Sequence, residues 1–187
     1  MPDLAFRPLR RADFERLRGW LNEPHVYAWW GADAAPDGLG GPGPQAATPA
    51  QVDAEYGPAA DGLDPTARFV ILVDGDPVGL IQWYPLADSP EYARAIAEPT
   101  GAGVDLLIGD PTRVGRGIGP AVIDQFVTEV VFAQPGVQRC VAGPDVRNER
   151  SIRAFTAAGF VWVRDASVPG EPAPEHVMVR TAPGPAG

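Results

Sequence analysis

A run of alternating glycines near the middle of the chain, Val114-Gly115-Arg116-Gly117-Ile118-Gly119, constrains the fold more than any other feature of the sequence. An apolar segment over residues 104–108 precedes the run, and Pro120 leads from it into a second apolar segment. This pattern predicts a strand, a glycine loop and a helix. Alternate glycines remove side chains from one side of a turn, and the free N–H groups of the following helix face that turn. The arrangement suits phosphate binding, although glycine turns before helices also occur for structural reasons alone.

The length of 187 residues allows one substantial core, so we expect a single domain over residues 1–180. The 22 glycines and 22 prolines exceed average usage and predict long, punctuated loops. We expect a mobile loop over residues 32–48, where the sequence is rich in Gly, Pro, Ala and Asp. Residues 181–187 are expected to form a flexible tail.

The formal net charge of −9 argues against nucleic-acid or anionic-membrane partners and favours a cationic small molecule. Cys140 is the only cysteine and lies in an apolar run, which predicts a buried, inert thiol and excludes a cluster of thiolate ligands. With two histidines, we expect no metal site. The chain begins without a signal-like segment, so we expect a cytoplasmic protein. We also expect a monomer or a homodimer.

Hydrophobic periodicity predicts a mixed sheet with helices on its faces. Pro24 is expected to close the first helix, Thr48 and Pro49 to begin the second, and Gly159 to end the last. A loop is expected over residues 88–103. The expected strands cover residues 4–10, 69–73, 78–84, 104–108, 137–142, 160–164 and 176–180, and the expected helices cover residues 13–21, 49–56, 120–132 and 148–158. The fold class is therefore α/β (α+β), with a mostly antiparallel sheet of about six or seven strands.

The glycine run and the segment from Asn148 to Phe160, which ends Ala157-Ala158-Gly159-Phe160, resemble the GNAT superfamily of acyl-CoA-dependent N-acyltransferases. Within it, Trp29-Trp30-Gly31 and Val104-Asp105-Leu106-Leu107-Ile108 resemble the aminoglycoside 6′-N-acetyltransferases. The resemblance spans nearly the whole chain and implies the GNAT fold, with acetyl-CoA as co-substrate.

The resemblance also implies which residues bind acetyl-CoA. The glycine loop is expected to bind its pyrophosphate, and the backbone of the preceding strand to pair with its pantetheine arm. The family motif usually begins with Arg or Gln, whereas Val114 stands here with Arg113 one residue earlier. The expected cofactor-binding residues are Leu106, Leu107, Ile108, Arg113, Val114, Gly115, Arg116, Gly117, Ile118, Gly119, Asn148 and Arg153.

Asp105 is the expected catalytic residue, because burying a charged carboxylate within an apolar strand is costly and such groups are often functional. It either faces solvent or accepts a hydrogen bond from the attacking amine and takes its proton, directly or through water. In the resembled family, the aspartate of this motif contacts the acceptor amine. Backbone N–H groups near Leu106 and Leu107 are expected to stabilise the oxyanion. Many members carry a tyrosine as general acid where this chain has Phe155, so the CoA thiolate is expected to leave unassisted.

The expected substrate-binding residues are Trp29, Trp30, Glu98, Asp105 and Asp145. The tryptophans can equally be core residues. Where Glu98 stands, the aminoglycoside enzymes carry an aspartate. The sequence therefore predicts an acetyl-CoA-dependent N-acetyltransferase that acts on a primary amine of a polycationic small molecule, most specifically the 6′-amine of an aminoglycoside, with antibiotic resistance as the implied role. Two alternatives stay open: a siderophore-pathway lysine or hydroxylysine N-acyltransferase, and a non-catalytic acyl-CoA-binding module.

Overall fold

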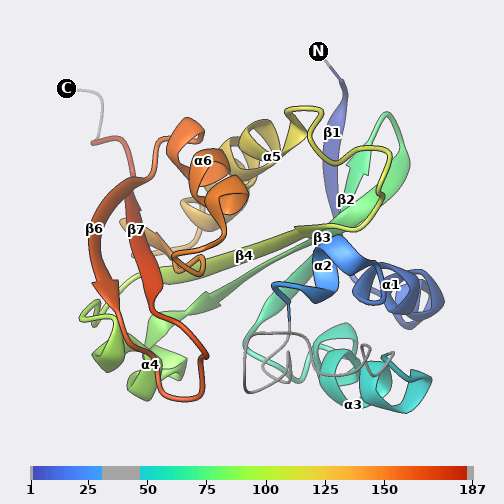
Figure 1. Ribbon diagram of the computed structural model, residues 1–187, viewed down its shortest axis with the longest axis horizontal. Helices are drawn as coiled ribbons and strands as arrows, with labels where there is room; N and C mark the ends of the chain where they lie inside the picture. Colours follow the sequence, from blue (N-terminus) through green and yellow to red (C-terminus); the bar gives the residue numbers. More distant parts are fainter. Residues whose placement is uncertain (1, 31–46, 185–187) are drawn as a thin grey trace. The chain divides into compact units, whose positions relative to one another are not determined.

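The computed structural model describes residues 2–30 and 47–184. Seven strands form one sheet, which agrees with the predicted number, and their order is β1-β2-β3-β4-β5-β7-β6 (Figure 1). The chain divides into two compact units, Met1–Gln82 with Leu106–Arg116, and Trp83–Asp105 with Gly117–Gly187. The loop expected over residues 32–48 lies almost wholly outside the described residues, as does the end of the expected tail.

The first unit begins with β1 (Leu4–Pro8), a 3-10 turn η1 (Arg11–Asp13) and α1 (Phe14–Leu21). Pro24 does not close this helix as expected. It is the first residue of a separate short helix, α2 (Pro24–Tyr27), where a proline costs no hydrogen bond because the first helical N–H has no partner. The next helix, α3 (Pro49–Ala60), is capped by Thr48 as predicted, in a capping box that Gln51 completes, and it runs four residues beyond the expected end.

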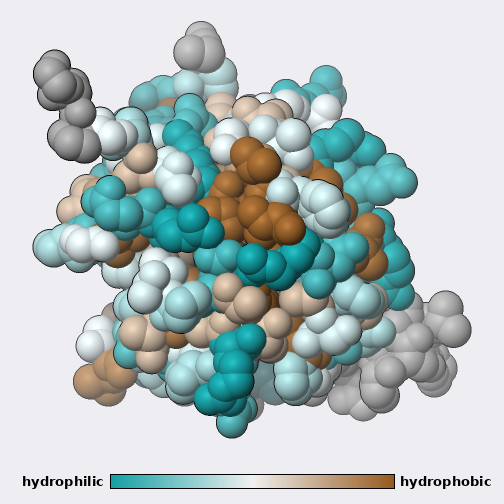
Figure 2. Space-filling view, turned by 90° about the vertical axis from the view of Figure 1, so that its left-hand side faces the viewer, coloured by the Kyte–Doolittle hydropathy of each residue, from teal (hydrophilic) through white to brown (hydrophobic). Residues whose placement is uncertain are grey.

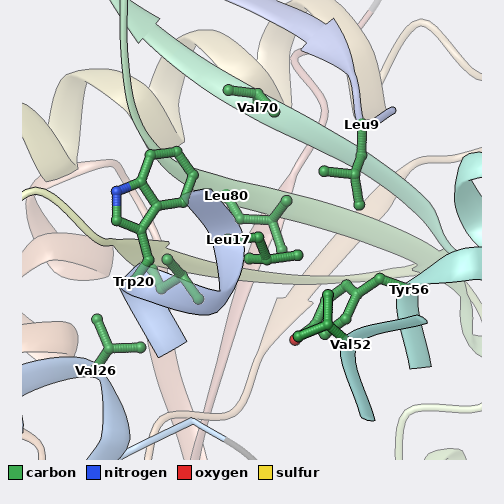
Figure 3. Packing of buried hydrophobic residues seen from close by; sticks show 9 residues of the cluster. Leu9, Leu17, Trp20, Val26, Val52, Tyr56, Val70 and Leu80 are labelled. Atoms are coloured by element: carbon green, nitrogen blue, oxygen red, sulfur yellow. The ribbon is translucent and has the colours of Figure 1, made fainter. Parts of the chain in front are cut away.

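A hairpin of β2 (Ala67–Val73) and β3 (Asp76–Pro85) follows, with Asp74 and Gly75 at its turn. Both turn residues have positive φ, which is the geometry that two-residue hairpins require. Strand β1 pairs antiparallel with β2. Apolar side chains from α1, α2, α3, β2 and β3 form one core cluster in this unit (Figure 3). Its buried members are Leu9, Leu17, Trp20, Val26, Val52, Tyr56, Val70, Leu80 and Leu107.

The second unit contains a 3-10 turn that ends where the loop expected over residues 88–103 begins, and a short helix within that loop. These are η2 (Leu86–Asp88) and α4 (Pro90–Ala95), the latter again begun by a proline, and they precede β4 (Ala102–Ile108). The polar composition of α4 hides the helix, because Ala93 is its one buried residue. Helix α5 (Ile118–Phe126) continues into a π-helical turn, η3 (Val127–Val131).

The remaining elements match their predictions closely. They are β5 (Arg139–Ala142), α6 (Glu149–Ala157), β6 (Val161–Ala166) and β7 (Glu175–Thr181). Asn148 caps α6 through its side chain, and Gly159 beyond it has a φ of 85°. Strand β6, at the sheet edge, carries the exposed apolar side chains Val161, Trp162 and Val163, and apolar surface gathers on that side of the molecule (Figure 2).

Candidate active site

Strand β4 carries Asp105, the predicted catalytic residue. It pairs in parallel with β5, and the register ends with Gly103 opposite Val141. Asp105 and Gly143 each lie two residues further along, beyond the last registered pair of the two strands. Side chains alternate along a strand, so Gly103 and Asp105 face the same side of the sheet. Asp105 itself is half-buried.

Two tyrosines and a glutamate line this side of the sheet. Gly103 lacks a side chain where the ring of Tyr84 lies, and an added Cβ would lie 2.6 Å from the Tyr84 hydroxyl. The Tyr84 ring meets Tyr92 of α4 edge to face, with 6.4 Å between ring centroids. The Tyr92 hydroxyl donates a hydrogen bond of 2.8 Å to Oε2 of Glu175. These contacts connect the β4 strand beside Asp105 to the beginning of β7.

Glu175 holds an unusual position for a carboxylate. A Cβ on Gly143 would clash with the Glu175 carboxylate and would lie 2.7 Å from the Tyr92 hydroxyl. Burial raises the pKa of Glu175 to about 7, and the charges of Asp105, Glu171 and Asp145 add to this rise, while the Tyr92 hydrogen bond lowers it. Sequence reasoning missed Glu175 because it lies at the start of an ordinary strand, far along the chain from Asp105. Gly143 indicates the position of the Glu175 carboxylate only once the strand register is known.

Burial also raises the pKa of Tyr84, Tyr92 and Cys140 above their ordinary values, and the charge of Asp105 contributes to each rise. These groups therefore stay protonated near neutral pH. The tyrosines act as hydrogen-bond donors rather than as ready acids. Cys140 is fully buried, which agrees with the inert thiol expected from the sequence.

The glycine loop has the open geometry that an anion site needs. Gly115 and Gly117 have φ values of 75° and 77°, and no atom lies within 4 Å of the position that a Cβ would occupy on either residue. Gly117 is the N-cap of α5 and supplies no side-chain cap, so the first N–H groups of the helix point toward the loop. Arg116 is exposed, while Arg113 lies 3.8 Å from the carboxylate of Asp76.

The end of β4 presents backbone groups along an edge away from β3. The N–H groups of Gly109 and Asp110 both donate to the Val78 carbonyl of β3. Successive residues of a strand point their backbone groups to opposite edges, so those of Leu106 and Ile108 face away from β3. The Ile108 carbonyl accepts a hydrogen bond of 2.8 Å from Nε2 of His25. The half-buried ring of His25 thus has a structural partner at the end of β4.

The structure gives Glu98 partners of its own. Its side chain is buried, and its two oxygens lie 2.8 Å from Arg139 and 3.1 Å from Arg164. Arg164 also donates to the Ile96 carbonyl. Because guanidinium groups take both oxygens, this geometry supports a structural role within the second unit, and we leave Glu98 out of the acceptor site.

Asp145 is likewise engaged, although it remains half-buried near Glu175. Both of its oxygens accept hydrogen bonds from the Arg147 guanidinium, at 2.9 and 2.6 Å. Burial opposes ionisation, but the hydrogen bonds of Arg147 hold the pKa of Asp145 below its ordinary value. Its backbone forms a bridge with that of Glu175, which fixes the start of β7 beside the segment after β5.

The two tryptophans differ in their surroundings. The Trp30 indole donates a hydrogen bond of 2.9 Å to the Tyr56 hydroxyl and packs against the core cluster of the first unit. Trp29 is 45% exposed. The core alternative therefore fits Trp30, whereas Trp29 is available to a ligand.

The two cofactor residues predicted on α6 also differ. The Asn148 side chain accepts a hydrogen bond of 3.1 Å from the Ser151 N–H, so this residue caps α6. Arg153 is exposed and pairs with Glu149 at 3.0 Å on the helix surface. Phe155 is buried edge to face against Phe160, which leaves no acidic proton at this position.

Within the described residues, no group of His, Cys, Asp or Glu side chains is arranged to hold a metal ion. No helix in those same ranges has both the length and the apolarity to cross a membrane.

A mostly antiparallel sheet interrupted by one parallel pair, with a glycine loop leading from the central strand into a helix, defines a class of acyl-CoA-dependent transferases. A family model described as acetyltransferase (GNAT) domain matches residues 42–168, and the chain belongs to this family of acyltransferases. The resemblance stated from the sequence is thereby confirmed.

Individual relatives point in the same direction. The chain is 27% identical to aminoglycoside N(6′)-acetyltransferase type 1 of Klebsiella pneumoniae, over 96% of this chain and 84% of that protein. It is 26% identical to the lysine N-acyltransferase MbtK of Mycobacterium tuberculosis, over 84% of this chain and 69% of the relative. Among solved structures, AAC(6′)-Ib in complex with ribostamycin and coenzyme A matches with a TM-score of 0.74 and 25% identity, covering 96% of this chain and 93% of that one.

Proposed function

We propose that the protein transfers the acetyl group of acetyl-CoA to a primary amine of a polycationic small molecule, and specifically to the 6′-amine of an aminoglycoside. The observation that carries the acceptor is the match with an aminoglycoside N(6′)-acetyltransferase across 96% of the chain. The net charge of −9 supports a cationic acceptor. Membership of the acetyltransferase family supports the reaction class.

The residues of the glycine loop fit the pyrophosphate of acetyl-CoA, which supplies an activated acetyl group. The positive φ values at Gly115 and Gly117 and the open space beside both glycines let backbone N–H groups approach phosphate oxygens. Exposed Arg116 adds a mobile cation. We assign cofactor binding to the backbone of residues 106–108, to the loop of residues 113–119, and to Asn148 and Arg153.

Backbone N–H groups of β4 are proposed to stabilise the oxyanion of the transfer reaction. The N–H of Leu106 faces the edge away from β3, whereas the carbonyl of Leu107 lies against Gly79 of β3. The edge geometry therefore favours Leu106 over Leu107 as the donor. A backbone donor is held rigidly by the strand, so it needs little reorganisation when charge develops.

Asp105 is proposed to bind the acceptor amine and to assist its attack. It lies half-buried at the strand end where Tyr84, Tyr92 and Glu175 also gather. A carboxylate there favours an ammonium group and orients the nitrogen. Trp29, which is exposed, and Asp145 are the further acceptor residues that we propose. Trp30 is left out, because it packs against the core of the first unit.

Departure of the thiolate needs no protein acid in this scheme. Phe155 has no proton to donate, and the raised pKa values of Tyr84 and Tyr92 make both phenols poor acids toward a thiolate. A thiol has an ordinary pKa of about 8.5, so it can leave as the anion and be protonated by water.

The test is a thiol-release assay of the purified protein with acetyl-CoA and a panel of aminoglycosides that includes kanamycin and ribostamycin, with mass spectrometry of the products. We expect turnover, and we expect Asp105→Asn to lower kcat by roughly 10²-fold. Asp88→Asn is the matched control, because Asp88 is exposed in η2 and the substitution removes the same charge. Absence of turnover across the panel contradicts the acceptor, and full activity of Asp105→Asn contradicts the role of Asp105.

The match to lysine N-acyltransferases favours one second candidate, acylation of a lysine or hydroxylysine side chain. The chemistry is the same, but the acyl donor and acceptor differ. A preference for long-chain acyl-CoA over acetyl-CoA, with turnover of lysine derivatives and none of aminoglycosides, would replace the first proposal by this one.

A further inference from the structure

The carboxylate of Glu175 replaces a side chain that the sheet lacks at Gly143. Glu175 is the first residue of β7, and its carboxylate lies where a side chain of residue 143 would stand. The backbone bridge between Asp145 and Glu175 fixes this approach. The Tyr92 hydroxyl, 2.8 Å away, fixes the orientation of the carboxylate. Strand β7 thus delivers an acidic group to the end of β5.

This part of β7 lies near enough to Asp105 for the charge of Asp105 to act on Glu175. Gly103 and Val141 are the last registered pair of two parallel strands, so residues 105 and 143 come next on the two chains. The Tyr84 ring against Gly103 and the Tyr92–Glu175 pair against Gly143 lie on one side of the sheet, joined by the Tyr84–Tyr92 ring contact. Asp105 shares that side with Gly103. Two carboxylates therefore approach the same space from β4 and β7.

The surroundings of Glu175 are acidic or neutral. In the part of the chain that the structure describes, no arginine or histidine forms an ion pair with Glu175. Arg147 is bound to Asp145, the residue whose backbone bridges Glu175. The groups that act on it are Tyr92 from α4, Asp105 from β4, Asp145 after β5 and Glu171 before β7. Together with burial, they raise its pKa to about 7, so protons exchange on this carboxylate near neutral pH.

We propose that Glu175 is the proton acceptor for the amine, while Asp105 holds the amine in place. The inference rests on the proposed function and divides the work between two carboxylates by their environments. An acceptor amine arrives as an ammonium group and must lose a proton before its lone pair can attack. A general base works best when its own pKa lies near the working pH, which is a condition that Glu175 meets.

The proton balance is as follows. One ammonium proton passes to the Glu175 carboxylate, and the freed lone pair forms the C–N bond at the thioester carbon. The C–S bond breaks, and the thiolate leaves with its electron pair. The second nitrogen proton is transferred through water to the thiolate, and Glu175 returns its proton to solvent, so one proton is released for each amide formed.

The experiment measures kcat and kcat/KM from about pH 5 to about pH 9 with acetyl-CoA and kanamycin. The wild type is expected to lose kcat/KM below about pH 7, and Glu175→Gln to lose roughly 10²-fold or more in kcat together with that acid limb. Glu175→Asp should restore part of the rate. Glu129→Gln is the matched control, since it removes the same charge from an exposed position in η3 and Glu129 is not among the groups that act on Glu175.

A second variant separates catalysis from folding. The Tyr92 hydrogen bond lowers the pKa of Glu175, so Tyr92→Phe should move the acid limb to higher pH while leaving most of the activity at about pH 9. If Glu175→Gln does not fold, the shift of the acid limb in Tyr92→Phe serves as the test of the proposal. An acid limb unchanged in Tyr92→Phe, or full kcat in a folded Glu175→Gln, overturns the role of Glu175 alone. Absence of wild-type turnover with every aminoglycoside overturns the proposed function and this inference with it.

Discussion

His25 of α2 donates a hydrogen bond of 2.8 Å from Nε2 to the carbonyl of Ile108, the last residue of β4. The bond joins a short helix near the amino terminus to the strand that leads into the glycine loop. It lies on the edge of β4 that faces away from β3, so the Ile108 carbonyl does not pair with β3. Gly109, the next residue, lies directly against the ring of Trp20 of α1, so two helical segments hold this strand end.

Loss of the His25 bond should destabilise the fold. His25→Ala leaves the half-buried Ile108 carbonyl without this donor, and we expect the free energy of unfolding to fall by about 1 kcal/mol. His25→Gln keeps an N–H donor of similar reach and should recover part of the loss. Urea denaturation followed by tryptophan fluorescence measures both. Equal stability of the wild type and His25→Ala would show that water satisfies the carbonyl as well as His25 does.

Local signals explain which elements the sequence predicts well. The hairpin at Asp74 and Gly75, the cap at Thr48 and the glycine loop are each determined by a few adjacent residues, so their sequence patterns suffice. Helix α4 escapes prediction because its short, polar segment is stabilised by packing within the second unit rather than by an apolar stripe. The start of α2 is not predicted from the sequence, because a proline occurs both after the end of one helix and at the first position of another.

The same distinction between local and long-range determinants applies to the candidate site. Asp105 and the glycine loop are predictable, because a carboxylate in an apolar strand and a glycine repeat are unusual within a few residues of chain. Glu175 is not predictable, since its role depends on the strand register that brings it to Gly143. Glu98 shows the converse: the resemblance to the aminoglycoside enzymes suggests the acceptor site, but its partners Arg139 and Arg164 are distant in sequence.

Removal of the Glu98 carboxylate should affect stability rather than acceptor binding. Glu98→Gln weakens two charged hydrogen bonds at a buried site, so we expect a loss of about 2 kcal/mol in the free energy of unfolding. The KM for the amine should stay at the wild-type value. Glu91→Gln, at an exposed position on α4, is the control for loss of the charge alone. A raised KM with unchanged stability would return Glu98 to the acceptor site.

The Arg7–Asp13 pair should make stability depend on pH in the acid range. Asp13 is buried and accepts hydrogen bonds of 2.7 and 2.6 Å from Arg7, which hold its pKa below the ordinary value although burial opposes this. A depressed folded-state pKa stabilises the protein above the unfolded value of about 3.9, and this contribution disappears as pH falls through the folded value. The stability difference between wild type and Asp13→Asn should therefore be constant near neutrality and shrink below about pH 4. Urea titrations at several pH values measure it, and a difference that does not vary with pH would contradict the assignment.

Substitution of Gly117 should separate cofactor binding from backbone strain. Gly117 caps α5 at a φ of 77°, and an alanine there costs about 1–2 kcal/mol because its Cβ is unfavourable in the left-handed region. Gly136 has a φ of 80°, is exposed and has equally open space around it, so Gly136→Ala imposes the same strain outside the loop. We expect both variants to lose similar stability but only Gly117→Ala to raise the KM for acetyl-CoA, by roughly tenfold, because the loop N–H groups no longer reach phosphate. Calorimetric titration with coenzyme A should show the same contrast. Equal effects of the two variants on coenzyme A affinity would remove the glycine loop from the proposed cofactor site.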